Sequence, residues 1–320
     1  MDSSLSQRGS LPFPPSRSNP VRRRIGGGCV FPFRRYDSMV VGASLDAPLV
    51  PSSAQGRFLS HVLLKKRQLF HFAAADKEAA FTRMFLSSGS DEASLHRRIA
   101  LLKEHYCQTA IEDIMYMLIL FKFSEIRVPL VPKLPGRLEI WPSKDWELQS
   151  IHSCDVLELI KEHSNAVISL RLDSTLTNYQ PTTEIDKHHL SQLYTASILY
   201  GYFLKSASLR HQLECSLSEH HGTLTNHLRQ YISGFDPKIL QRCAKPRSRE
   251  AKNLIEKQSL ALFGTKESQE IIVTSFSTLK RLLLEAVAFG TFLWDTEEYV
   301  DGAFQLKENE NAEEEENSSV

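Results

Sequence analysis

Hydrophobic side chains in the central part of the chain recur at spacings of three and four residues, the period of a helix that buries one face. The longest such stripe runs from about Ser90 to Phe123, and its apolar members are Leu95, Ile99, Leu102, Tyr106, Ala110, Ile114, Leu118 and Phe121. Further helical patterns begin after Ser143, at Thr183, at Asp236 and at Glu267, the last reaching Trp294. The sequence shows no sustained strand alternation. The pattern therefore predicts an all-α fold, a multi-helix bundle with several long core helices.

The connection after the longest stripe differs from the helices around it. Proline cannot occupy a helix interior, and this region carries Pro129, Pro132, Pro135 and Pro142. We therefore expect residues 126–142 to form an extended, Pro-rich connector whose apolar residues lie along the domain. A second, polar connection at residues 171–182 predicts a surface loop.

Capping residues mark the helix ends in the last third of the chain. Asp236 followed by proline is a typical helix start, because the side chain caps the free amides and proline suits the first turn. Pro246 ends that helix, Ser248 restarts it, and Gly264 closes it. Two other glycines, Gly201 and Gly290, lie inside strong helical patterns, where glycine costs about 1 kcal/mol. We expect another helix to pack closely against each of these two.

The first 43 residues have a different composition. Residues 1–36 contain seven arginines, many serines and a single acid, Asp2, which is typical of an organelle transit peptide. Proline and the glycine run 26–28 favour a plastid over a mitochondrion. Small residues at 40–43 mark the expected cleavage region. The alternative is a disordered basic tail, or one that binds nucleic acid.

The rest of the chain is predicted to be one soluble helical domain, residues 44–304, followed by a disordered acidic tail, residues 305–320. A separate small N-terminal subdomain at residues 55–87 stays open as an alternative. No run approaches the roughly 18 apolar residues that a membrane span requires. Five cysteines without a close pair argue against disulfides and a Cys-based zinc site, so we expect mostly buried thiols.

Two neighbouring carboxylates, Glu112 and Asp113, lie inside the longest apolar stripe. Adjacent side chains on a helix point about 100° apart, so one of them is expected to face the core and to need a partner there. Arg97, Arg98 or a basic residue of the last helix could supply it, which would make a structural salt bridge. Without a partner, the buried acid would be a candidate site residue.

Twelve histidines raise the question of a metal site. His211 and Glu214 are three residues apart and would share a helix face, so they join Glu112 and Asp113 as metal candidates. A helical di-metal site would need Glu-x-x-His motifs on two helices, and this sequence has none. Surface or capping histidines are the alternative. No cofactor, phosphate-binding loop, dinucleotide fingerprint or catalytic set is indicated.

A basic stretch between residues 238 and 257 is the candidate site for an anion or RNA, and its members are Arg242, Lys245, Arg247 and Arg249. Glu250 and Glu256 interrupt the stretch, and no stacking aromatics are interleaved with it. A solvated helix face is the alternative. Because the chain after residue 43 is mildly acidic, its net charge does not indicate a nucleic-acid-binding protein.

Several segments match one family in order and spacing: residues 96–100 (HRRIA), 110–116 (AIEDIMY), 147–152 (ELQSIH), 160–163 (IKEH), 192–197 (QLYTAS), 200–204 (YGYFL), 279–287 (LKRLLLEAV) and 289–295 (FGTFLWD). In these segments the chain resembles the plant chloroplast UV-B-induced proteins, which are built on a domain of unknown function. The resemblance covers roughly Gln55 to Asp301. It implies a plastid location and a helical fold, and it carries over no catalytic residue.

These observations predict a non-enzymatic protein of the chloroplast stroma that acts through protein partners in UV-B or stress acclimation. The alternative is a metal or small-molecule binding protein, or an enzyme with a site in the helical core. Binding of RNA through the basic stretch is a third and less favoured hypothesis.

Overall fold

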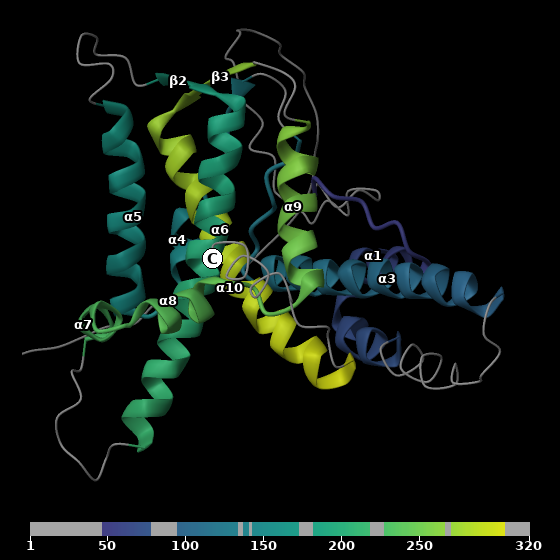
Figure 1. Ribbon diagram of the computed structural model, residues 1–320. Coiled ribbons are helices and arrows are strands. Elements are labelled where there is room, and N and C mark those ends of the chain that lie inside the picture. Colours follow the sequence, from purple (N-terminus) through teal and green to yellow (C-terminus); the bar gives the residue numbers. More distant parts are fainter. Residues whose placement is uncertain are drawn as a thin grey trace, which may run out of the picture. The chain divides into compact units, whose positions relative to one another are not determined.

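The computed structural model describes residues 47–77, 95–133, 137–140, 143–172, 182–217, 227–265 and 270–304, all within the unit Gly42–Val320. Helices dominate this part of the chain, so the prediction of a mainly all-α fold is confirmed (Figure 1). The expected transit peptide, the acidic tail and the helix start at Ser90 lie outside the described residues. None of the described helices is long and apolar enough to cross a membrane.

The centre of the fold is the crossing of two long helices, α6 (Lys187–Leu217) and α10 (Phe276–Phe304) (Figure 1). Their backbones meet at the two glycines singled out in the sequence. A Cβ atom at Gly201 would overlap the carbonyl oxygen of Val287, and one at Gly290 would overlap that of Ile198. The prediction of close helix packing at these glycines is therefore confirmed.

The other described helices pack on this pair or on one another. They are α1 (Ala54–Lys65), the short 3₁₀ helix η1 (Arg67–Leu69), α3 (Leu95–Glu125), α4 (Asp145–Gln149), α5 (Cys154–Leu172), α7 (Leu228–Ser233), α8 (Pro237–Ala244) and α9 (Arg249–Phe263). The second half of α3 is almost entirely buried and contacts α1, α9 and α10. The single helical stretch expected after Ser143 is divided into α4 and α5.

The predicted caps of α8 and α9 are present. Asp236 accepts a hydrogen bond from the amide of Ile239 at 2.7 Å, and Ser248 caps α9 through the amide of Ala251. At the other end of α9, Gly264 has a φ of 75° and donates its N–H to the carbonyl of Leu260. Local chemistry in the sequence was sufficient to place these helix ends.

The sequence pattern predicted no strands, but the described residues contain a small three-stranded sheet beside the helices. Its strands are β1 (Arg137–Leu138), β2 (Thr182–Asp186) and β3 (Ile271–Ser275), in the order β1-β3-β2. β1 is parallel to β3, and β2 is antiparallel to it. Strand β2 occupies part of the predicted loop and of the helix expected from Thr183, whereas β3 replaces the start of the last predicted helix.

Both misassigned strands run directly into a helix, which explains the error. Asp186 ends β2 and Lys187 begins α6, whereas Ser275 ends β3 and Phe276 begins α10. Five residues contain too few alternations to stand out beside a helical pattern of about thirty residues. The β-branched residues of these segments were the available signal.

The cysteines are less uniformly buried than expected. Cys107 and Cys243 are buried, but Cys154 is exposed and Cys215 is half-buried. Among the described residues, no disulfide joins any two of these four cysteines.

Candidate functional site: a hydroxyl-lined pocket at the end of the sheet

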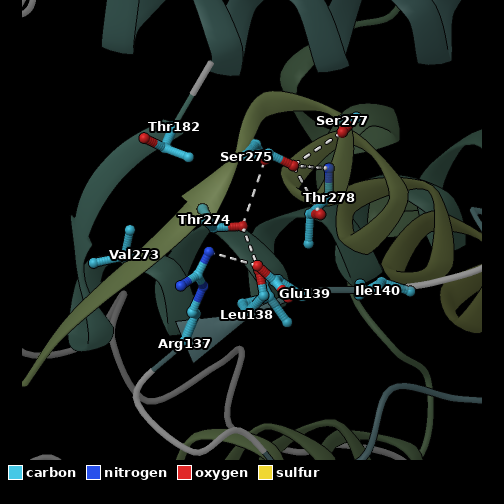
Figure 2. A pocket seen from close by; sticks show the side chains of 10 residues that line it. All are labelled: Arg137, Leu138, Glu139, Ile140, Thr182, Val273, Thr274, Ser275, Ser277 and Thr278. Atoms are coloured by element: carbon cyan, nitrogen blue, oxygen red, sulfur yellow. Dashed lines mark hydrogen bonds and ion pairs between the residues drawn. The ribbon is translucent and has the colours of Figure 1, made fainter. Parts of the chain in front are cut away.

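A pocket of about 300 Å³ lies where the sheet meets the first turn of α10 (Figure 2). The carboxyl ends of β1 and β3 meet there because the two strands are parallel. The amino end of β2 joins them because β2 is antiparallel, with Thr182 opposite Ser275. Ligand sites of α/β proteins lie at the corresponding end of a parallel sheet. The topology therefore places this pocket where polar side chains of separate segments converge.

Hydroxyl groups dominate the polar lining. They belong to Thr182, Thr274, Ser275, Ser277 and Thr278. A hydroxyl both donates and accepts hydrogen bonds, so such a lining can match many polar groups. A volume of about 300 Å³ lies at the lower end of the range of small-molecule sites. The pocket is therefore suited to one polar side chain or a small molecule.

Hydrogen bonds fix several of these hydroxyls (Figure 2). Ser275 Oγ accepts from the amide of Thr278 at 3.2 Å, which caps α10, and lies 2.9 Å from the hydroxyls of Ser277 and Thr278. Thr274 Oγ1 donates to the carbonyl of Leu138 at 3.1 Å and so ties β3 to β1. The pocket wall is thus organised by the same bonds that join the strands to the helix.

One ion pair lies at the rim. Arg137 and Glu139 are 2.7 Å apart, and their side chains are 70% and 69% exposed. An exposed pair of this kind contributes about 0–1 kcal/mol. It neutralises the rim, and either side chain can turn toward a ligand at little cost.

Sequence analysis missed this site because its residues come from three distant segments and none has a rare chemistry. The available signal was the run Thr274 to Thr278, in which four of five residues carry hydroxyls. A helix start so rich in serine and threonine was interpreted only as part of a helix.

The structure places the predicted metal candidates Glu112 and Asp113 in the core, each with its own partner. Glu112 accepts from the Asn253 amide at 2.9 Å and pairs with Lys257 of α9. Asp113 accepts from the backbone amide of Ser53 at 2.6 Å. The salt-bridge alternative therefore describes Glu112, although its partner comes from α9 and not from the helices expected.

The other two metal candidates lie near the end of α6. Glu214 pairs with Arg210 at 2.9 Å, and the ring of His211 lies 4.8 Å from that of Tyr231, with Nε2 3.4 Å from Sγ of Cys215. Within the described ranges, no group of three or more His, Cys, Asp or Glu residues could hold a metal ion. The structure thus does not bring the four candidates together.

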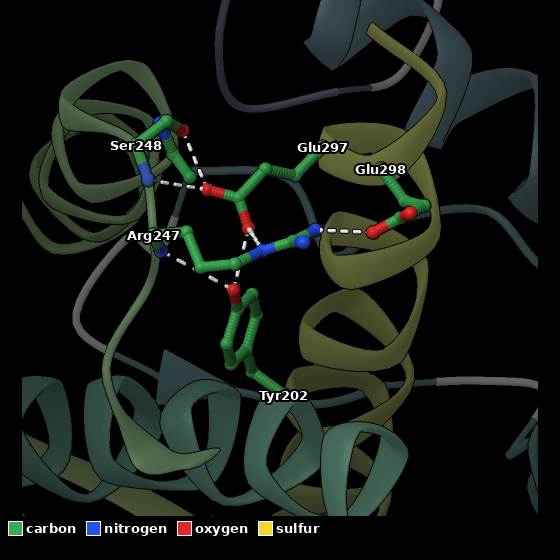
Figure 3. Close-up of polar contacts among 6 residues, drawn as sticks. Tyr202, Arg247, Ser248, Glu297 and Glu298 are labelled. Carbon is green, nitrogen blue, oxygen red and sulfur yellow. Dashed lines mark hydrogen bonds and ion pairs between the residues drawn. The ribbon is translucent and has the colours of Figure 1, made fainter. Parts of the chain in front are cut away.

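The basic stretch is divided by the break between α8 and α9. Arg242 and Arg249 are exposed and Lys245 is half-buried. Arg247 instead belongs to a polar cluster: it contacts Glu298 at 2.6 Å and Glu297 at 3.6 Å (Figure 3). Its guanidinium also lies 5.4 Å from the ring of Trp294. Arg247 is therefore engaged within the fold.

Glu297 is the centre of that cluster. The carboxylate is buried and accepts from the Ser248 amide at 2.6 Å, the Ser248 hydroxyl at 2.5 Å and the Tyr202 hydroxyl at 2.5 Å (Figure 3). Burial and the neighbouring Glu297 raise the pKa of Tyr202. The cluster joins the start of α9 to α6 and α10, which is a structural role.

A second buried cluster holds the Pro-rich connector. Arg281 pairs with Glu285 at 2.9 Å, and both side chains are essentially inaccessible. Arg281 also donates to the carbonyl of Pro129 at 3.2 Å, and Glu285 accepts from the amide of Val131 at 3.1 Å. Burial raises the pKa of Glu285, while Arg281 and the Val131 amide oppose the rise. Sequence analysis did not identify this pair.

The fold and the site together define a mainly helical domain with a small mixed sheet and a polar pocket at its end. Residues 94–217 and 227–301 match the family described as Protein of unknown function (DUF760), and the chain belongs to this family. The chain is also 33% identical to a chloroplastic UV-B-induced protein of Arabidopsis thaliana, over 81% of this chain and 77% of that protein. No solved structure matches the chain.

These matches confirm the predicted resemblance to the chloroplast UV-B-induced proteins. The location in the relative's name supports a chloroplast location for this chain. The family match covers α3 to α10 and therefore includes all three strands of the sheet and the pocket.

Proposed function

We propose that this protein is a non-enzymatic protein of the chloroplast stroma that acts through protein partners in UV-B acclimation. The name of the Arabidopsis relative, a chloroplastic UV-B-induced protein, supports the chloroplast and the response to UV-B. The protein's contribution is binding, and the pocket at the end of the sheet is the place where a partner docks.

The observation that carries this proposal is the hydroxyl-lined pocket itself. Its hydroxyl lining, in which Thr182 and Ser277 are exposed, and the ion pair at its rim present groups that can donate and accept hydrogen bonds. The buried carboxylates that could have served as acids or bases, Glu112 and Glu285, are each held by structural partners. The polar side chains that line the pocket are thus suited to binding a partner, whereas the buried carboxylates Glu112 and Glu285 stabilise the fold.

The size and position of the pocket indicate how the partner is held. A space of about 300 Å³ accepts a single polar side chain, and exposed residues such as Thr182 and Ser277 surround it. An extended segment lying over the end of the sheet could insert such a side chain, as in other recognition modes that use strands. We therefore place the centre of the interface over the first turn of α10.

The test is to fill the pocket. Ser277 is exposed on the first turn of α10, so Ser277→Phe adds a bulky side chain at the pocket without opening the core. Ser233→Phe, at an exposed serine of α7, is the matched control. Tagged chains recovered from stroma would be compared by native mass spectrometry. We expect the wild type and the control to carry a protein subunit that Ser277→Phe has lost.

Two other results would contradict the proposal. If Ser277→Phe retained every partner, the pocket would not be the docking site. If the wild-type chain carried a small molecule and no protein subunit, the protein would be a small-molecule binder, as the alternative hypothesis states. Measurement of protein abundance before and after UV-B exposure tests the physiological part, which an unchanged level would contradict.

A further inference from the structure

The sheet continues beyond the pocket as a solvent-facing surface with a distinct chemistry. Side chains alternate between the two faces of a strand, and on this outer face Glu184 lies opposite Val273 and Asp186 lies opposite Ile271. Thr182 and Val273, which belong to the same face, also line the pocket (Figure 2). Pocket and outer face thus form one surface.

An apolar strip runs along β3 on this surface. Ile271 is 61% exposed, and Val273, two residues further, is half-buried. The acids Glu184 and Asp186 stand beside them on β2, and both are exposed. An apolar strip bordered by charge has the composition of an interaction surface more than of a solvated sheet face.

The charges on this face do not cancel. Arg137 pairs with Glu139 at 2.7 Å, and Lys187 pairs with Glu270 at 2.5 Å. The positive charges of Arg137 and Lys187 are therefore each balanced by an acid. Among the described residues, neither Glu184 nor Asp186 forms an ion pair. Asp186 also accepts a hydrogen bond from the amide of His189 at the start of α6. The outer face of β2 therefore carries a net negative charge next to the apolar strip.

We propose that this surface, the outer face of β2 and β3, binds an extended basic segment of a partner protein. Lysine or arginine side chains of that segment meet Glu184 and Asp186, an apolar side chain covers Ile271 and Val273, and a polar one enters the pocket. Charge complementarity selects the partner and its direction along the strand. The inference rests on the proposed function, and adds to it the chemistry of the partner.

A synthetic probe tests the inference without knowledge of the natural partner. The probe is a fluorescein-labelled ten-residue peptide in which lysine alternates with valine, and its matched control has glutamate in place of every lysine. Fluorescence anisotropy measures the affinity of the full chain for each. We expect the lysine peptide to bind at least about tenfold more tightly, and its affinity to fall with increasing salt.

Variants of the protein locate the binding site. Glu184→Lys is expected to lower the affinity for the lysine peptide about tenfold, and Ile271→Ser is expected to lower it by a smaller factor. Both side chains are exposed, so both variants should fold, which circular dichroism would verify. Glu256→Lys makes the same charge change at an exposed position of α9 and should leave the affinity unchanged. Asp186 is left intact because it caps α6.

Equal affinity for the two peptides, or an unchanged affinity in Glu184→Lys, would overturn the inference. The result for Ser277→Phe in stroma separates this failure from that of the proposed function. If Ser277→Phe still loses the partner subunit in stroma although the protein does not bind the lysine peptide, only the inference that the partner segment is basic is wrong. If Ser277→Phe also has no effect, the docking site itself is wrong.

Discussion

Buried charges in this protein lie at the contacts between elements. Glu112 joins α3 to α9, Glu285 joins α10 to the Pro-rich connector, and Glu297 joins α10 to the start of α9. A buried carboxylate is costly unless hydrogen bonds replace its hydration. Here each carboxylate accepts from groups of another element, so the same side chain that demands partners also fixes how two elements meet. Glu112 therefore lies inside an apolar stripe for a structural reason and does not mark a catalytic site.

The buried carboxylate of Asp113 also joins two elements, and its removal should lower the stability. Its carboxylate accepts from the Ser53 amide at 2.6 Å, and Ser53 caps α1. Asp113→Ala would leave that buried amide without its charged partner, and we expect a loss of about 2 kcal/mol in the free energy of unfolding. Urea denaturation measures this loss. Glu158→Ala, at an exposed acid of α5, should change the stability by less than about 0.5 kcal/mol. Equal effects of the two changes would contradict the assignment.

His152 predicts a pH dependence of stability. Burial, reinforced by nearby Lys205, lowers the pKa of His152 to about 4, whereas the unfolded chain protonates a histidine near pH 6.5. Between these values the unfolded state binds more protons, so the free energy of unfolding falls as the pH drops from about 6.5 to 4. The contribution reaches about 3 kcal/mol at the acid end. Burial also lowers the pKa of His163, which acts in the same direction.

The variant His152→Gln isolates this contribution. Urea unfolding at pH 7 and at pH 4.5 gives the free energy of the wild type and of the variant, and groups such as Glu285 cancel in the difference. As the pH falls, we expect the free energy of unfolding to decrease less in the variant than in the wild type. His105→Gln, at an exposed histidine, is the control for the loss of an imidazole. A His152→Gln curve parallel to that of the wild type would show that the side chain is solvated.

Sequence reasoning predicted the elements of this fold where a local pattern or cap determined them. The long helix α3, the caps of α8 and α9 and the close approach at Gly201 and Gly290 were all predicted. The strands β2 and β3 were missed because their stability comes from pairing between residues about ninety positions apart, as in Thr183 opposite Thr274. The pocket was missed for the same reason, since no local pattern records which strand ends meet.

The crossing of α6 and α10 predicts opposite outcomes for glycines on the same helix. Gly290→Ala would place its methyl group against the carbonyl of Ile198, and we expect a loss of about 3 kcal/mol or more, or failure to fold. Gly302→Ala, near the exposed end of α10, meets no atom within 4 Å. It should stabilise the protein by about 0.5–1 kcal/mol, because alanine is the better helix former. Thermal unfolding of the two variants measures the contrast.

Gly201→Ala tests the same contact from the other helix, since its methyl group would overlap the carbonyl of Val287. A stability close to that of the wild type in either buried variant would mean that α6 and α10 are further apart than described. A loss of stability in Gly302→Ala as large as in Gly290→Ala would show that the loss in Gly290→Ala does not come from the helix crossing.

At the scale of the whole molecule, the buried core and the surface of the sheet have different chemistries. The core residues and their buried ion pairs hold α3, α6, α9 and α10 together, whereas the sheet, built on the ends of α6 and α10, carries the pocket and the acidic outer face. The contacts that stabilise the fold and the proposed docking surface thus use different residues. Changes at Ser277 or Glu184 can therefore be read as changes in binding, whereas changes at Glu285 or Gly290 are read as changes in folding.

The framework also limits where the predicted transit peptide could be cleaved. Leu49 packs against the core, Pro51 and Ser53 are buried, and the Ser53 amide is bound by Asp113. Cleavage beyond Ser53 would remove these contacts and leave Asp113 buried without its partner, a cost of about 1–3 kcal/mol from that group alone. We therefore expect the mature chain in chloroplasts to begin before Ala47, in agreement with the cleavage predicted at residues 40–43. N-terminal peptide mapping by mass spectrometry of protein recovered from chloroplasts measures the position. A mature chain that began after Ser53 and kept full stability would show that this segment is not part of the fold.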